Sequence, residues 1–511
     1  MLAQINTIGL LGIDGFTVRV QADVSNGMPS LEVIGLPDTA VKEAKERAKT
    51  AIKNSGCRFP SKHVTINLAP AATKKEGSSY DFPISVSILA ATEQLIIPDS
   101  DISVFIGELS LDGKVNPVSG VLPMIISAYK AGFRKMYVPV ENADEAAVID
   151  GAEIYPTSSI HELIDHFSGA KPIEPHVVSI DNYLEGSGGG LLDFSDVKGQ
   201  ETVKRALEIA AAGNHNILLI GSPGTGKTML AQRMTGILPD MTFDEALEVT
   251  KIHSIAGTLP ANTPLIKYRP FRSPHHTISA MGLSGGGSIP RPGELSLAHN
   301  GILFLDELPE FRRDVLEVLR QPLEDGTVTI SRVNATLTYP CNIMLIASMN
   351  PCKCGYFGDP GRNCTCTPAQ VLAYRSRISG PLLDRIDIQV EVSPVNYSQL
   401  SSQRSGEKSA DIKKRVDRTR KIQLERYKDY DNIFSNSQLT AGMLSEFCRL
   451  TPDADAVLKS AFDNLGFSAR AHSRILKVAR TIADLEGSEG IKKEHIAEAI
   501  QYRSLDRKYF G

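Results

Sequence analysis

The stretch NILLIGSPGTGKTML, Asn216 to Leu230, decides the fold. Its apolar run, Ile217 to Ile220, predicts a short buried strand. The octet GSPGTGKT, Gly221 to Thr228, follows with the spacing G-x-x-x-x-G-K-T, and apolar residues then begin a predicted helix. A strand, a glycine-rich loop and a helix in this order are typical of a phosphate-binding loop. The stretch therefore predicts an α/β fold with a parallel sheet that binds a nucleotide.

The chemistry of such a loop assigns a role to each residue type. Glycines let backbone N–H groups face phosphate oxygens, the lysine reaches the β- and γ-phosphates, and the threonine hydroxyl ligates Mg²⁺. The alternative is a chance match in a glycine-rich turn, which the flanking strand and helix argue against. The residues predicted to bind the nucleotide are Gly221, Ser222, Pro223, Gly224, Thr225, Gly226, Lys227 and Thr228.

Two later strands end in polar residues that suit the same site. GILFLDEL, Gly301 to Leu308, ends in an acidic pair in which Asp306 suits Mg²⁺ and Glu307 suits a base that polarises the attacking water. NIMLIASMN ends in Asn350, which either holds that water against the γ-phosphate or is an ordinary turn residue.

An arginine follows in GPLLDRIDIQV. Arg385 either pairs with Asp384 or Asp387 or reaches the γ-phosphate of a neighbouring subunit as an arginine finger. The second reading requires an oligomer.

Length and composition describe an ordinary globular protein. The chain has 511 residues, 42% hydrophobic and 22% charged, and a net charge of −4. This length suggests about three domains. We expect no membrane span and no signal peptide, and hence a cytoplasmic protein. The net charge gives no overall attraction to nucleic acid, so any such binding depends on local basic patches.

The glycine-rich run EGSGGG, Glu185 to Gly190, marks a flexible linker. We expect an α+β domain over 1–175, a linker over 176–192, an ATPase core over 193–395 and a helical lid over 396–511.

These motifs in this order resemble the AAA+ ATPases, and within them the magnesium-chelatase branch and its YifB/ComM family. The resemblance covers essentially the whole chain and rests on strings such as RPFRSPHHTIS, GGGSIPRPGELSLAHNGILFLDELPEF, RISGPLLDRIDI and SARAHSRILKVARTIADLEG. It implies an ATP- and Mg²⁺-dependent homo-hexamer that acts on forked, branched or single-stranded DNA, as a helicase that promotes branch migration in recombination or natural transformation. The alternative is a motor that remodels a protein partner, as the magnesium chelatase ATPase subunit does.

The resemblance also implies roles for single positions. Gly221 to Thr228 is the Walker A loop, Asp306 and Glu307 form Walker B, Asn350 is sensor 1 and Arg385 is the finger supplied in trans. Arg470 corresponds to the sensor 2 arginine, with Arg474 as the alternative.

Two insertions of this branch predict contacts in a central pore. They are the segment from about Phe271 to Pro292 and a hairpin in GTVTISRVNATLTYP, Gly326 to Pro340. The candidate phosphate contacts, each with a packing role as the alternative, are Arg272, His275, His276, Arg291 and Arg332. A basic helix after the core is either a solvated face or a second phosphate-binding surface through Lys413, Lys414, Arg415, Arg418, Arg420, Lys421 and Arg426.

The first domain resembles the Lon protease catalytic domain, of the ribosomal-S5-like fold class. Ser79 lies near the place of the nucleophile, but Met124 occupies the place of the lysine base and cannot accept a proton. Lys130 lies on the same predicted helix at nearly the opposite phase. We therefore expect no peptidase activity, and a domain that assembles the protein or binds a protein partner.

Four of the seven cysteines lie in NPCKCGYFGDPGRNCTCTP, Asn350 to Pro368. Clustered cysteines in a reducing compartment are more often metal ligands or redox thiols than disulfides. The C-x-C spacing is tighter than that of most structural zinc sites, so a structural Zn²⁺ site and free or redox-paired thiols both remain open. The four candidate ligands are Cys352, Cys354, Cys364 and Cys366.

Overall fold

The computed structural model describes residues 1–75, 77, 79–179, 192–287, 290–332, 335–359, 361–396, 406–430, 433–465, 467–505 and 509. The chain forms two units: Met1–Glu185 with Phe243–Lys267, and Gly186–Thr242 with Tyr268–Gly511. The glycine-rich run of the predicted linker lies outside the described residues. None of the helices in the described ranges is long and apolar enough to cross a membrane.

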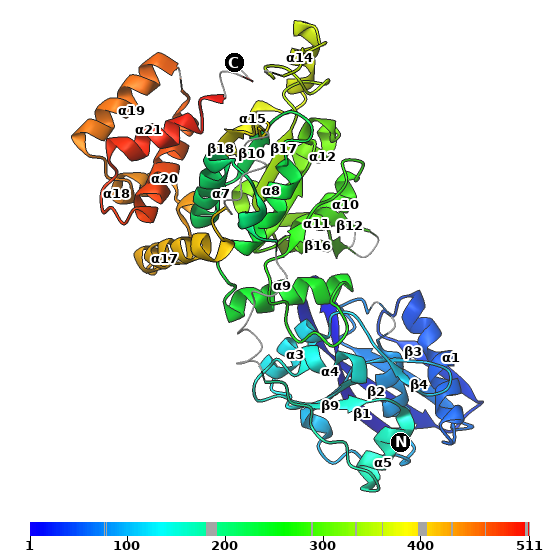
Figure 1. Ribbon diagram of the computed structural model, residues 1–511. Helices are drawn as coiled ribbons and strands as arrows, with labels where there is room; N and C mark the ends of the chain where they lie inside the picture. Colours follow the sequence, from blue (N-terminus) through cyan, green and yellow to red (C-terminus); the bar gives the residue numbers. More distant parts are fainter. Residues whose placement is uncertain are drawn as a thin grey trace. The chain divides into compact units, whose positions relative to one another are not determined.

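The first unit is built on a seven-stranded mixed sheet in the order β3-β4-β2-β1-β5-β8-β9 (Figure 1). Its strands are β1 (Leu2–Leu11), β2 (Asp14–Ser25), β3 (Ser30–Ile34), β4 (His63–Ala69), β5 (Ser103–Phe105), β8 (Lys135–Pro139) and β9 (Glu153–Thr157), with β6 (Glu108–Leu109) and β7 (Val115–Asn116) as a separate pair. Its helices are α1 (Thr39–Asn54), α2 (Asp81–Ala91), α3 (Val121–Lys130), α4 (Ala143–Ala146), α5 (Ile160–Ser168) and α9 (Phe243–Ala256).

Local sequence explains why these elements form. Strand β2 alternates buried Val18, Val20 and Ala22 with more exposed residues, as a sheet with one covered face requires. Helix α1 begins at Asp38, whose carboxylate accepts a hydrogen bond from the backbone N–H of Val41 at 2.8 Å. The predicted α+β character of this region is confirmed.

Helix α9 departs from the predicted organisation. The sequence places it inside the ATPase core range, whereas the structure groups it with the first unit. It packs against α3, and the backbone N–H of Gly120 donates to the carbonyl of Ser254 at 3.0 Å. Leu265, just after the helix, joins Leu122 and Val148 in a small buried cluster. Apolar burial within the first unit therefore accounts for the placement of this segment.

The second unit contains a five-stranded sheet in the order β11-β14-β17-β10-β18, and every neighbouring pair is parallel. Its strands are β10 (Ile217–Ile220), β11 (Phe271–Arg272), β14 (Ile302–Leu305), β17 (Met344–Met349) and β18 (Ile388–Glu391). β10, β14 and β17 are buried along their whole length, as parallel strands covered on both faces are. The predicted parallel α/β core is confirmed.

Short pairs and helices complete the second unit. The pairs are β12 (Gly285–Gly286) with β13 (Arg291–Pro292), and β15 (Thr327–Arg332) with β16 (Ala335–Pro340), which is the predicted hairpin. The helices are α7 (Glu201–Gly213), α8 (Lys227–Arg233), α10 (Ala280–Ser284), α11 (Glu294–Leu297), α12 (Arg313–Val318), α13 (Pro322–Asp325), α14 (Pro368–Arg375), α15 (Gly380–Leu383), α17 (Ser409–Tyr427), α18 (Ala441–Phe447), α19 (Pro452–Leu465), α20 (Ala469–Leu485) and α21 (Lys493–Gln501).

The described residues of the helical region after the sheet, α17 to α21 (Figure 1), share one apolar cluster with the sheet strands. Helix α7 packs against both α17 and α20, and one apolar cluster runs from the sheet strands into α20 and α21. The helical character predicted for this region is confirmed, and the boundary at residue 395 stays a prediction.

Candidate functional site

Three neighbouring parallel strands end at the candidate nucleotide site. β10 leads into the loop Gly221–Gly226, β14 ends just before Asp306, and β17 ends just before Asn350. In open parallel sheets, ligands bind beyond the carboxyl ends of the strands. Gly224 and Gly226 have positive φ angles of 79° and 88°, which let the loop curl back before α8 begins. The structure thus brings the predicted loop, acidic pair and asparagine to one edge.

Lys227 is nearly buried in this loop. Its Nζ donates to the carbonyls of Gly221 at 2.7 Å and Ser222 at 3.0 Å, and to Oδ1 of Asn350 at 3.2 Å. Burial lowers the pKa of the Lys227 ammonium, while the charges of Asp306 and Glu307 act in the opposite direction. A buried ammonium that donates only to neutral oxygens is suited to an anionic ligand that replaces its carbonyl partners.

Asp306 is the centre of a short chain of hydrogen bonds. The hydroxyl of Thr228 donates to its Oδ2 at 2.7 Å, and the hydroxyl of Ser348 donates to Oδ1. The backbone N–H of Glu307 also donates to Oδ1, at 3.0 Å. The contact of Ser348 with Asp306 was not predicted, although a serine in the otherwise apolar strand MLIASM could have indicated it.

Glu307 has a left-handed backbone with φ of 54°, and its side chain is half exposed. Nδ1 of His276 lies 3.8 Å from its Oε2. The two histidines of the predicted pore segment lie against each other, with ring centroids 4.0 Å apart and ring planes tilted by 36°. The sequence reading treated His276 as a phosphate contact, and its place beside the acidic pair was not predicted.

Arg385, the candidate finger, is held by its own chain. Its guanidinium donates to the carbonyls of Arg320 at 2.9 Å and Pro381 at 2.7 Å, and pairs with the carboxylate of Glu324. The predicted partner Asp384 instead pairs with Arg470 at 3.2 Å. Contact with a neighbouring subunit would require Arg385 to leave Glu324.

The two sensor 2 candidates differ in exposure. The Arg470 side chain is two-thirds exposed, at 66%. Arg474 is largely buried, with Nη1 3.5 Å from Oδ1 of Asp387. Burial lowers the pKa of Arg474 while Asp387 opposes this shift. Arg470 is therefore the more accessible of the two sensor 2 candidates.

The candidate phosphate contacts are not equally accessible. Arg272 forms a bidentate pair with Glu294, at 2.7 and 2.8 Å, which raises its pKa and occupies its guanidinium. Arg291 is exposed on β13. Arg332 ends β15 at the turn of the hairpin, and its side chain lies outside the described residues.

The basic helix α17 is mostly neutralised within the chain. Arg426 is the clearest case, because both of its Nη atoms donate to Asp484, at 2.5 and 2.8 Å. Carboxylates or carbonyls of the same chain accept hydrogen bonds from Lys413, Lys414, Arg415, Arg418, Arg420 and Arg426. This pairing favours the solvated-face reading over a phosphate-binding surface.

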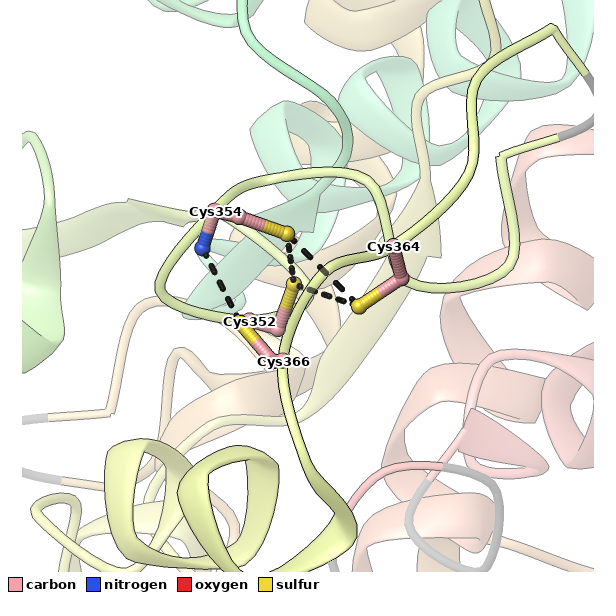
Figure 2. A group of neighbouring side chains, drawn as sticks. All are labelled: Cys352, Cys354, Cys364 and Cys366. Atoms are coloured by element: carbon pink, nitrogen blue, oxygen red, sulfur yellow. Dashed lines mark hydrogen bonds between the residues drawn. The ribbon is translucent and has the colours of Figure 1, made fainter.

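The four cysteines converge in the loop between β17 and α14, as Figure 2 shows. Sγ of Cys352 lies 3.3 Å from Sγ of Cys354 and 3.7 Å from Sγ of Cys364, and Cys354 and Cys364 are 3.6 Å apart. The backbone N–H of Cys354 donates to Sγ of Cys366 at 3.4 Å. All four sulfur atoms lie within 4.8 Å of one another.

This geometry fits a tetrahedral metal site. A metal ion about 2.3 Å from each of four sulfurs would place the sulfurs about 3.8 Å apart. The observed separations exceed the bond length of about 2.05 Å in a disulfide, and all four cysteines are free. Burial raises the pKa of Cys354, but hydrogen bonds from the backbone of Tyr356 and Thr365 outweigh it and lower the pKa, whereas burial and the neighbouring sulfurs raise the pKa of Cys364 and Cys366. The cluster could therefore bind a metal ion.

The residues of the Lon-like comparison lie in the first unit. Met124 is buried in the apolar face of α3, and Lys130 is exposed at the end of that helix. Ser79 is half-buried in the turn before α2. The buried Lys75 donates to the carbonyl of Pro70. Met124 has no amine and Lys130 is exposed, so neither residue offers the buried amine that a Lon-type serine needs as its base.

Three models of protein families match most of the chain. Residues 193–400 match the model described as magnesium chelatase, subunit ChlI, residues 20–142 match a second model for that subunit, and residues 406–503 match the model for its C-terminal part. Together with the parallel sheet and its phosphate-loop motif, these matches define the class: an AAA+ ATPase of the magnesium-chelatase type.

Full-length relatives give the particular family. The chain is 44% identical to the protein YifB of Salmonella typhimurium over 99% of this chain and 98% of that protein. It is 41% identical to competence protein ComM of Haemophilus influenzae over the same shares. The chain belongs to the YifB/ComM family. Over 134 residues, 26% of this chain, it is also 29% identical to Lon protease 2 of Bacillus subtilis, of which 24% is covered.

Membership of this family implies ATP and Mg²⁺, and the residues present fit both. Mg²⁺ prefers oxygen ligands, which the Thr228 hydroxyl and the Asp306 carboxylate supply 2.7 Å apart. Lys227 supplies a buried amine at the loop that would hold phosphates.

Proposed function

We propose that this chain is the subunit of a homo-hexameric, ATP-driven DNA motor in the cytoplasm. It would act on forked, branched or single-stranded DNA as a helicase that drives branch migration in recombination or natural transformation. The observation that carries the nucleotide chemistry is the convergence of Lys227, Asp306 and Asn350 at one sheet edge. Full-length similarity to a protein named for competence supports DNA as the partner.

Each residue of the site has one task in this proposal. Lys227 exchanges its carbonyl partners for the β- and γ-phosphate oxygens. Thr228 and Asp306 hold Mg²⁺, which when bound offsets the negative charge of the phosphates. Glu307 accepts a proton from the attacking water, and Asn350 orients that water, because its amide already lies at the lysine. Ser348 fixes the Asp306 carboxylate so that Oδ2 faces Thr228.

The rival partner is a protein, as for a chelatase-type remodelling ATPase. The internal pairing of basic side chains on α17 favours this rival, because it leaves fewer unpaired positive charges on that helix for DNA.

DNA stimulation of ATP hydrolysis distinguishes the two partners. We expect four-way-junction and forked DNA to raise the turnover of the full-length protein, and Lys227→Ala to abolish hydrolysis with or without DNA. A turnover that no DNA structure changes would contradict the DNA motor.

We also infer that the cysteine cluster holds a structural zinc ion. Four thiolate ligands complete a tetrahedral shell and leave no position for substrate, so the role is structural. Metal analysis of the purified protein should give about one zinc ion per chain, and Cys364→Ser should lower this content. Protein that contains no metal, with four reactive thiols, would contradict the assignment.

The first unit is proposed to bind a protein partner without peptidase activity. Peptide hydrolysis that Ser79→Ala removes would overturn this proposal.

A further inference from the structure

The loop from Cys352 to Cys366, here called the cysteine loop, lies directly against the phosphate-binding loop. The hydroxyl of Ser222 donates to Oδ2 of Asp359 at 2.5 Å. Gly355 packs on the ring of Pro223, where a Cβ atom would come within 2.5 Å of the proline Cδ. Two adjacent residues of the phosphate-binding loop therefore rest on the cysteine loop.

Asp359 is itself fixed by the turn that carries it. Its other oxygen, Oδ1, accepts the backbone N–H of Gly361 at 2.8 Å. Hydrogen bonds from Ser222 and from the backbone of Gly361 lower the pKa of Asp359, so the carboxylate is charged at neutral pH and accepts on both sides. Arg362 donates to the Tyr356 hydroxyl at 2.7 Å and links the two halves of the turn.

The opposite side of the cysteine loop is anchored to the end of the chain. The guanidinium of Arg375 lies between the rings of Phe357 and Tyr509, 4.6 and 4.7 Å from their centroids. Its Nε donates to the carbonyl of Pro351 at 3.0 Å. Arg375 therefore holds the loop at its base, through Pro351, and at Phe357, and the rest of the segment between the two C-x-C pairs is held by the sulfur cluster and by short polar contacts.

We propose that Asp359 is a positioning residue for nucleotide binding, and that a metal ion at the four cysteines keeps it in place against Ser222. The proposal rests on the structural metal inferred above. A glycine-rich turn without an apolar core loses conformational entropy when it is ordered, and a metal cross-link at its base reduces that loss. A phosphate-binding loop that is fixed before the ligand arrives binds more tightly, because less ordering accompanies binding.

Two roles of Asp359, repulsion of phosphates by its charge and positioning of Ser222, predict different results. If the Asp359 carboxylate mainly repelled phosphates, Asp359→Ala and Asp359→Asn would both bind nucleotide more tightly. If Asp359 positions Ser222, Asp359→Ala weakens binding by about tenfold, the cost of one charge-assisted hydrogen bond. Asp359→Asn then loses less affinity than Asp359→Ala, because its amide oxygen still accepts one of the two hydrogen bonds that the carboxylate accepts from Ser222 and Gly361.

The test measures the dissociation constant of a fluorescent ATP analogue for the full-length protein, without DNA. The proteins are the unmodified chain, Asp359→Ala, Asp359→Asn and Asp112→Ala, each with its metal and after removal of the metal by a chelator with a thiol reagent. Asp112 is the matched control, because it accepts from Ser110 in a comparable exposed turn of the first unit. Circular dichroism checks that each protein is folded.

We expect metal removal to weaken nucleotide binding about tenfold in the unmodified chain and in Asp112→Ala, but to have little further effect in Asp359→Ala. Added zinc should restore binding in the unmodified chain. Unchanged affinity in Asp359→Ala, or an equal loss on metal removal in Asp359→Ala and the unmodified chain, would overturn the proposal. Because nucleotide affinity is measured without DNA, failure of the DNA motor leaves this test unaffected.

Discussion

Asp387 is a buried carboxylate that links the sheet to the helical region. Nδ1 of His215 lies 3.2 Å from its Oδ2, and Arg474 lies 3.5 Å from its Oδ1. Burial would raise the pKa of Asp387, but the hydrogen bond with His215 and the charge of Arg474 lower it to about 2. The unfolded value is about 3.9, so the ionised form contributes about 2 to 3 kcal/mol to folding above that pH. This contribution is lost as the pH falls from about 4 to 2.

We therefore expect Asp387→Asn to lower the free energy of unfolding by about 2 to 3 kcal/mol at pH 7 and much less near pH 2. Urea unfolding followed by circular dichroism at both pH values measures the difference. Asp384→Asn is the control, because its pair with the exposed Arg470 contributes under about 1 kcal/mol. Equal losses in both variants, or a loss independent of pH, would refute the account of Asp387.

Single residues of the nucleotide site were predictable where a local pattern fixes them. Lys227, Asp306 and Asn350 follow buried strands, and a parallel sheet brings strand ends to one edge. The contacts of Arg385 with Glu324 and of Asp359 with Ser222 were not predictable, because their partners are far apart in sequence. No periodicity or spacing encodes such pairs.

The hairpin β15–β16 carries the pore contact predicted at Arg332. If Arg332 contacts phosphate, Arg332→Ala weakens DNA binding for all sequences and reduces the slope of log affinity against log salt by about 1 per contact. Fluorescence anisotropy with a labelled fork across a range of salt concentrations measures this slope.

Lys414→Ala on α17 is the matched control, because Lys414 is exposed and pairs with Asp411 in its own helix. We expect its salt slope to equal that of the unmodified protein. A larger change of the salt slope in Lys414→Ala than in Arg332→Ala would indicate that DNA binds at α17 and not at the hairpin.

Individual helices and strands were predicted better than their division between the two units. Local pattern predicted the strands β10, β14 and β17, because each depends on its own residues. The packing of α9 in the first unit depends on Leu122 and Val148, which lie far earlier in the chain. Local pattern contains no information on such a pairing.

In the proposed ring, a residue that completes the nucleotide site of a neighbouring subunit would couple the subunits. If Arg385 acts in trans, subunits with Lys227→Ala and with Arg385→Ala should complement each other when mixed. Roughly a quarter of the interfaces in a random ring then pair an intact site with an intact arginine. Hydrolysis by the mixture should exceed that of either variant alone.

Glu324→Gln is the control for this experiment, because it removes the charged partner of Arg385 in its own chain and keeps the arginine. It should retain hydrolysis. If rings still form but the mixture is no more active than either variant alone, Arg385 does not act in trans and instead stabilises its own subunit.

Branch migration of a synthetic junction distinguishes a DNA motor from an ATPase that acts on another partner. A synthetic four-way junction with one labelled strand is incubated with the full-length protein, ATP and Mg²⁺, and the products are separated on a native gel. The account predicts conversion of the junction to two duplexes that requires ATP and is absent with Lys227→Ala. Hydrolysis of ATP by the unmodified protein without movement of any junction or fork would contradict it.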